Sequence, residues 1–219
     1  MKESKRNLIS FIGYILTAIL VLTGTVIMFA TKAKGGALLS KGFENFKFFT
    51  VESNVFYGIV AIIMAITKFR VIKGKINEVP YVLKVVNLVG MVGITLTFVT
   101  VMAFLGPVYG YNIMFNNANL FFHLICPVMA LITYIGFETS KPIKFIHTLF
   151  CLIPPFVYGV FYFVNVAVHN AYGNFDIDFY GFGANGPVGG IISLLLTLVA
   201  SYLITLLIYF VNKLVNRHR

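Results

Sequence analysis

The feature that most constrains this chain is a series of six long apolar stretches separated by shorter polar segments. They run over Leu8–Ala30, Phe48–Thr67, Tyr81–Leu105, Asn119–Phe137, Phe145–Val168 and Val188–Val211. A helix of about 20 mostly apolar residues crosses a bilayer, and inside lipid the backbone must satisfy its own hydrogen bonds. The sequence therefore predicts an all-α membrane protein, with six transmembrane helices in one bundle and a single domain over residues 1–219.

Lysine and arginine are concentrated in alternate connecting segments. They lie before the first span, between spans two and three, between spans four and five, and after the last span; the segments after spans three and five carry none. The positive-inside rule then predicts a multi-pass protein of the cell membrane with both termini in the cytoplasm. The segment after the first span is the exception, because it carries Lys32, Lys34, Lys41 and Lys47. We attribute the net charge of +10 to topology, and expect neither a nucleic-acid partner nor an obligatory protein partner.

Polar side chains gather at the predicted outer end of the bundle. On the second span they follow i, i+3, i+4, i+7 spacing and so share one helical face: Thr50, Ser53, Asn54 and Tyr57. A matching stripe of Asn116, Asn119 and His123 opens the fourth span, and the fifth carries Tyr158, Tyr162, Asn165 and His169. Asp176 and Asp178 follow in the next loop. Polar groups at membrane depth are costly, which makes them candidates for function.

The most reactive combination in this cluster is Thr50 with His123. A threonine hydroxyl becomes a nucleophile when a base removes its proton, and histidine is the natural base near neutral pH. Asn54, Asn119 and the N–H groups of the helix beginning near Thr50 are candidates for holding an oxyanion. Pro127 should kink the helix at His123, four residues earlier, and so turn His123 into a cavity or free its carbonyl as an acceptor. The alternatives are that Thr50 caps its helix and that His123 bonds a neighbouring helix.

Glu52 is the acid that falls inside a predicted span, and it points about 200° around the helix from Thr50. We expect it to pair with His169 or with a lysine of the first outer loop. His123, His169, Glu52 and Asp176 are also metal-ligand types, but their spacing does not support a metal site. Neither a metal nor a cofactor is therefore predicted.

Two short motifs resemble a known family. FFTVESN at the start of span two and NLFFHLICP at the start of span four are similar to the bacterial branch of the androgen-induced and androgen-dependent membrane hydrolases. That family has a similar length and six-span layout. The resemblance implies a threonine hydrolase of membrane lipids, with Thr50 as nucleophile and His123 as base, in a family whose animal members cleave fatty acid esters of hydroxy fatty acids. The residues after Thr50 read ESN, unlike the animal pattern, so the substrate need not transfer.

Three functions remain open from the sequence. The leading one is a lipid ester hydrolase near the outer leaflet that takes membrane lipids as substrates, and the others are a solute or lipid binding or transport protein and an acyltransferase. In the enzyme, supporting roles are expected for Ser53, Asn54, Asn119, Asn165, His169, Asp176, Asp178 and Glu52; one of the two aspartates could orient His123. Lys41 and Lys47 are expected to attract a lipid carboxylate or phosphate.

Overall fold

The computed structural model describes residues 3–31, 42–138, 143–171, 178–181 and 186–216 of the chain. Six helical segments are long and apolar enough to cross a membrane: Glu3–Ala30, Phe49–Ile72, Tyr81–Tyr109, Ala118–Phe137, Phe145–His169 and Gly186–Val215. The described residues contain no strand. The predicted all-α, six-span class is therefore confirmed. The helices continue past the apolar stretches into polar residues at several ends, because a helix remains stable beyond the hydrocarbon boundary.

The six segments are divided where their helical geometry changes. The elements are α1 (Glu3–Ala30), η1 (Gly42–Lys47), α2 (Phe49–Ile72), α3 (Tyr81–Thr100), η2 (Val101–Leu105), α4 (Gly106–Tyr109), α5 (Tyr111–Met114), α6 (Ala118–Leu120), η3 (Phe121–Ile125), α7 (Cys126–Leu131), η4 (Ile132–Phe137), η5 (Phe145–Leu152), α8 (Ile153–Ala171) and α9 (Gly186–Asn216). The segments η1 and η5 are 3₁₀ helices, whereas η2, η3 and η4 are π-helical.

Proline explains two of the π-helical segments. Pro127 lies in the first turn of α7, and the turn before it, which contains His123, is the π segment η3. Pro107 lies in the first turn of α4, directly after the π segment η2. Proline has no N–H, and its ring pushes the carbonyl four residues earlier away from the helix axis. The widened turn absorbs this change without ending the span.

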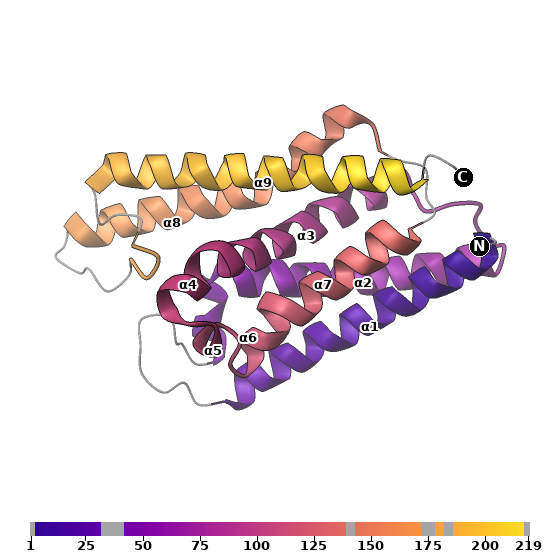
Figure 1. Ribbon diagram of the computed structural model, residues 1–219, viewed down its shortest axis with the longest axis horizontal. Coiled ribbons are helices and arrows are strands. Elements are labelled where there is room, and N and C mark those ends of the chain that lie inside the picture. The colour runs from indigo at the N-terminus through magenta and orange to yellow at the C-terminus, as the bar shows by residue number, and fades with distance from the viewer. Residues whose placement is uncertain (1–2, 32–41, 139–142, 172–177, 182–185, 217–219) are drawn as a thin grey trace.

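The spans form two layers. α8 and α9 run side by side along one side of the molecule, and α1, α2, α3 and α7 make up the rest (Figure 1). α1 begins and α9 ends at the same end of the bundle, which we call the terminal end (Figure 1). We call the opposite end, where α2 begins and α3 passes into η2, the cavity end. The two layers meet chiefly along α3.

α1 illustrates how the bundle is organised. Most residues on its buried side are small or polar, such as Ser10, Gly13 and Thr17, and the others are Tyr14, Val21 and Met28. Its exposed side carries large aliphatic residues: Leu8, Ile12, Leu16, Ile19, Leu22 and Val26. A Cβ added at Gly13 would come within 2.4 Å of Thr133 Oγ1, so glycine permits the close approach of α1 to η4. An apolar outside with small residues at helix contacts is the arrangement expected in lipid.

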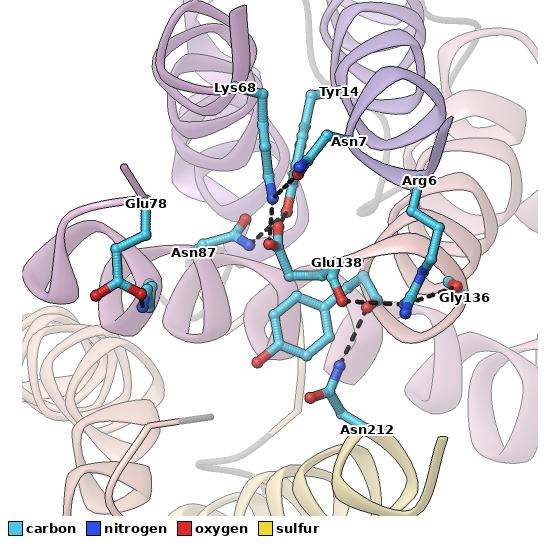
Figure 2. A network of polar contacts seen from close by, with 11 residues as sticks. Arg6, Asn7, Tyr14, Lys68, Glu78, Asn87, Gly136, Glu138 and Asn212 are labelled. Carbon is cyan, nitrogen blue, oxygen red and sulfur yellow. Dashed lines mark hydrogen bonds and ion pairs between the residues drawn. The ribbon is translucent and has the colours of Figure 1, made fainter. Parts of the chain in front are cut away.

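A buried ion pair joins the spans near the terminal end. Lys68 Nζ lies 2.5 Å from Glu138 Oε1, and the two side chains are 1% and 7% exposed. Tyr14 donates to the other oxygen of Glu138 (2.8 Å), and the Asn87 amide donates to the Tyr14 hydroxyl (2.7 Å). Figure 2 shows these side chains converging from α1, α2, α3 and the end of the fourth span.

Backbone carbonyls at the end of the fourth span extend this network. Arg6 Nη2 donates to the carbonyls of Gly136 and Glu138, and Asn212 of α9 donates to the carbonyl of Tyr134 (Figure 2). These carbonyls lie at the end of the π segment η4, where helical hydrogen bonding stops. The network therefore ties the C-terminal end of the fourth span to α1, α2, α3 and α9.

Candidate functional site

A cavity of about 150 Å³ lies at the cavity end, between α2, the end of α3 with η2, and the α8–α9 layer. Its walls are mostly apolar or aromatic, with side chains such as Phe49, Leu96, Leu105, Phe163 and Leu194. The polar residues of its wall all carry hydroxyl groups: Thr50, Thr97, Thr100, Tyr109, Tyr158, Tyr180 and Thr197. A small apolar cavity with a few polar groups is typical of a ligand site.

The threonine hydroxyls in the wall differ in what they bond. Throughout the described residues, every threonine except Thr50 and Thr100 donates its hydroxyl to a carbonyl three or four residues earlier. Thr97 donates to Ile94 (2.8 Å) and Thr197 to Ser193 (2.9 Å) in this way. Both exceptions line the cavity. Their hydroxyl protons are therefore available to a bound molecule.

The position of Thr50 in its helix explains why its hydroxyl is available. α2 begins at Phe49, so Thr50 lies in the first turn, where no earlier helical carbonyl can accept from it. The carbonyl of Lys47, three residues earlier, instead accepts from the Tyr158 hydroxyl (2.6 Å). The backbone N–H of Thr50 likewise has no acceptor among the described residues. Thr50 does not cap α2, because the N-cap position is Phe48.

Asn54 connects the two sequence motifs. Its amide donates to the Thr50 carbonyl (2.8 Å) and to the Phe122 carbonyl (3.1 Å), and the side chain is fully buried. Ser53 is also buried and donates to the Thr50 carbonyl (3.2 Å). The π segment η3 exposes the Phe122 carbonyl to this amide. Asn54 thus fixes the first turn of α2 against η3, which precedes Pro127.

His123 does not belong to the cavity wall formed by the described residues. Its ring is buried, and Nδ1 lies 2.8 Å from the Met114 carbonyl. A carbonyl only accepts, so Nδ1 carries a proton, and in the neutral ring Nε2 then keeps the lone pair. The Met114 carbonyl therefore holds the histidine in the tautomer that a base acting through Nε2 requires. The structure brings the segments of Thr50 and His123 together through Asn54, but does not bring their side chains together in the cavity.

Aromatic residues line the cavity on the side of the segment that connects α8 to α9. Tyr162 donates to Asp178 (2.7 Å) and accepts from the Tyr180 N–H (2.9 Å), which places Phe179 and Tyr180 in the cavity wall. Burial raises the pKa of Tyr180 to about 12, so this phenol stays protonated near neutral pH. Asp178, one of the two aspartates expected to orient His123, instead accepts from the Tyr162 hydroxyl. The Met114 carbonyl contacts the His123 ring in its place.

Lys47 lies beside this aromatic group. Its Nζ is 5.2 Å from the ring centres of both Phe48 and Phe179, and the side chain is exposed. A cation over two aromatic faces is held by their negative ring faces. Because Phe179 also lines the cavity, Lys47 places a positive charge near the cavity.

The other predicted site residues lie apart from the cavity wall or outside the described residues. Glu52 and Asn165 are exposed, and His169 bonds the Asn165 carbonyl of its own helix (2.8 Å). No ion pair joins Glu52 to His169 or Lys47. Asn119 is half-buried outside the cavity wall that the described residues form, and Lys41 and Asp176 lie outside the described residues. Within the part of the chain that is described, no three His, Cys, Asp or Glu side chains form a metal-binding group.

The sequence analysis did not identify Thr100. The available signal is Pro107, seven residues later, which predicts a disturbed turn by the same reasoning that applies to Pro127. Thr100 is the last residue of α3 before that disturbed turn.

Comparison with known proteins adds no assignment: no protein-family model, curated protein or solved structure matches this chain.

Proposed function

We propose that this chain is an integral-membrane lipid ester hydrolase, in which the cavity holds an acyl group and Thr50 attacks the ester. The observation that carries the proposal is that Thr50 lines an apolar cavity and that its hydroxyl donates to no carbonyl in the described residues. The apolar walls suit an acyl chain. The Thr50 hydroxyl and the Thr50 N–H, which have no acceptor among the described residues, suit its ester carbonyl.

The reaction would proceed in two balanced steps. Thr50 Oγ1 attacks the ester carbonyl carbon, its proton passes to a base, and the alcohol leaves with that proton to give acyl-Thr50. Water then attacks the acyl carbon, loses a proton to the same base, and releases the carboxylic acid while Thr50 recovers its hydroxyl. The Thr50 N–H, at the start of α2, would bond the developing oxyanion.

The proposed base is His123, acting through Nε2. The contact of Nδ1 with the Met114 carbonyl supports this assignment, because it leaves Nε2 as the acceptor. Since the ring is outside the cavity wall, proton transfer requires an intervening water or a change of side-chain conformation. The Asn54 amide hydrogen-bonds both the Thr50 and the Phe122 carbonyls, and this link between the two motif segments supports a common site. The resemblance of the two motifs to the androgen-induced hydrolases supports it as well.

We further propose that the cavity end faces the outside of the cell membrane and that Lys47 attracts an acidic lipid headgroup. The distribution of lysine and arginine supports this orientation, with both termini in the cytoplasm. The proximity of Lys47 to Phe179, a cavity-lining residue, supports the headgroup role.

A fluorophosphonate probe tests the nucleophile. The purified protein in detergent should become covalently labelled as Thr50 Oγ1 displaces fluoride from phosphorus. Thr50→Val, which keeps the shape of the side chain, should abolish labelling. Thr67→Val is the matched control, because Thr67 lies on the same helix and donates to Ile63. Equal labelling of Thr50→Val and Thr67→Val would eliminate the proposed hydrolase.

The probe assay should be followed by lipid analysis and a flux assay in proteoliposomes. Release of free fatty acid supports hydrolysis, whereas transfer of the acyl group to another lipid indicates an acyltransferase with the same intermediate. Movement of an intact lipid or solute, with Thr50→Val still active, would instead indicate a transport protein.

A further inference from the structure

We infer that Thr100 is a second substrate-contacting residue of this site, whose hydroxyl donates to the ester carbonyl that Thr50 attacks. This inference rests on the proposed function. It starts from the hydroxyl proton of Thr100, which, like that of Thr50, goes to no carbonyl among the described residues.

The chemistry of an ester determines which hydroxyls in the cavity wall are useful to it. Both ester oxygens accept hydrogen bonds and neither donates, so a wall hydroxyl must offer its proton. Thr97 and Thr197 give their protons to Ile94 and Ser193, and Tyr158 gives its proton to Lys47. Among the threonines of the wall, Thr50 is required as the nucleophile. Thr100 is then the threonine donor left for the carbonyl oxygen.

The local helix geometry is a second observation at Thr100. It ends α3 and is followed directly by the π segment η2, whose Val101 and Leu105 also line the cavity. Single π turns within helices interrupt the regular ladder of hydrogen bonds, and they occur frequently at functional sites. Thr100 thus directly precedes the π segment η2, and His123 lies within the π segment η3.

Thr50 and Thr100 line the same cavity. An ester carbonyl placed for attack by Thr50 therefore lies in a space that Thr100 also borders. When Thr50 attacks, negative charge grows on the carbonyl oxygen. A hydroxyl proton from Thr100 and the N–H of Thr50 then supply the two donors of an oxyanion hole.

The test is a steady-state assay of the full chain in detergent micelles with a fluorogenic aryl octanoate ester. Thr100→Val should lower kcat by about a hundredfold with little change in KM, because the lost hydrogen bond strengthens in the transition state. Thr100→Ser, which restores a hydroxyl, should recover most of the activity. The matched control is Thr95→Val, on the same helix but outside the cavity wall, where the hydroxyl donates to Met91 (2.8 Å).

The outcomes separate this inference from the proposed function. If Thr50→Val abolishes hydrolysis while Thr100→Val behaves like Thr95→Val, the role of Thr100 is overturned and the hydrolase stands. A rise in KM at constant kcat in Thr100→Val, or no recovery in Thr100→Ser, also overturns it. If Thr50→Val hydrolyses the ester like wild type, both proposals fail. Thermal unfolding of each variant identifies any loss that comes from misfolding.

Discussion

Replacing Glu138 by glutamine should strongly destabilise the protein, because it leaves the charge of Lys68 buried opposite a neutral side chain. At 2.5 Å and an effective dielectric constant of about 20, the attraction between the two charges is about 6–7 kcal/mol. Desolvation of both ions offsets much of this attraction in the intact pair, but removing one partner leaves the other uncompensated. We expect the free energy of unfolding to fall by about 3–5 kcal/mol.

A second ion pair supplies the control for this prediction. Glu78 bonds Lys84 at 3.0 Å, but the Glu78 side chain is 51% exposed. Glu78→Gln makes the same chemical change and should cost less than about 1 kcal/mol. Both variants would be measured by reversible unfolding in mixed micelles, with circular dichroism as the signal.

The double variant Lys68→Met/Glu138→Gln tests the cause. It removes both charges, so it should be more stable than the sum of the two single effects predicts, by about 2 kcal/mol or more. If the single effects are additive, or if Glu138→Gln costs no more than Glu78→Gln, the network in Figure 2 does not hold the spans together as described.

Three further predictions address the site and the bundle. Lys47→Gln should lower hydrolysis of anionic lipid esters several-fold more than that of neutral ones, measured in vesicles of each composition; equal loss on both would remove the headgroup role. Asn54→Leu should lower the free energy of unfolding by about 1–3 kcal/mol, because the buried carbonyl of Phe122 loses its donor. Unchanged stability would show that the hydrogen bond between Asn54 and Phe122 does not stabilise the bundle. Gly13→Ala should cost about 1–3 kcal/mol, since its Cβ would meet Thr133, and Thr133→Ser should relieve part of that loss; a neutral Gly13→Ala would contradict the close packing of α1 on η4.

Hydropathy was sufficient to predict the helical class and the number of spans, because lipid leaves the backbone few alternatives. The same kind of local reasoning predicted irregular helix geometry, a kink, before Pro127, and the structure has the π segment η3 there. Both predictions depend on properties of a single segment.

The contacts between segments could not be predicted in this way. Helical periodicity placed His123 on a stripe with Asn116 and Asn119, but its ring turns toward the Met114 carbonyl, which the chain brings back from α5. Glu138 directly follows the fourth apolar stretch and was not among the candidate residues, yet it is 5% exposed and bonds Lys68. Thr100 was missed because its importance comes from the cavity it faces and from the π segment beside it.

The most direct test of the proposed mechanism is to locate the covalent adduct by peptide mass spectrometry after reaction with the fluorophosphonate. The proposal predicts one adduct, on the peptide that contains Thr50, and its absence in Thr50→Val. An adduct on another residue, with Thr50 unmodified in the wild-type protein, would show that the available hydroxyl at the start of α2 is not the nucleophile.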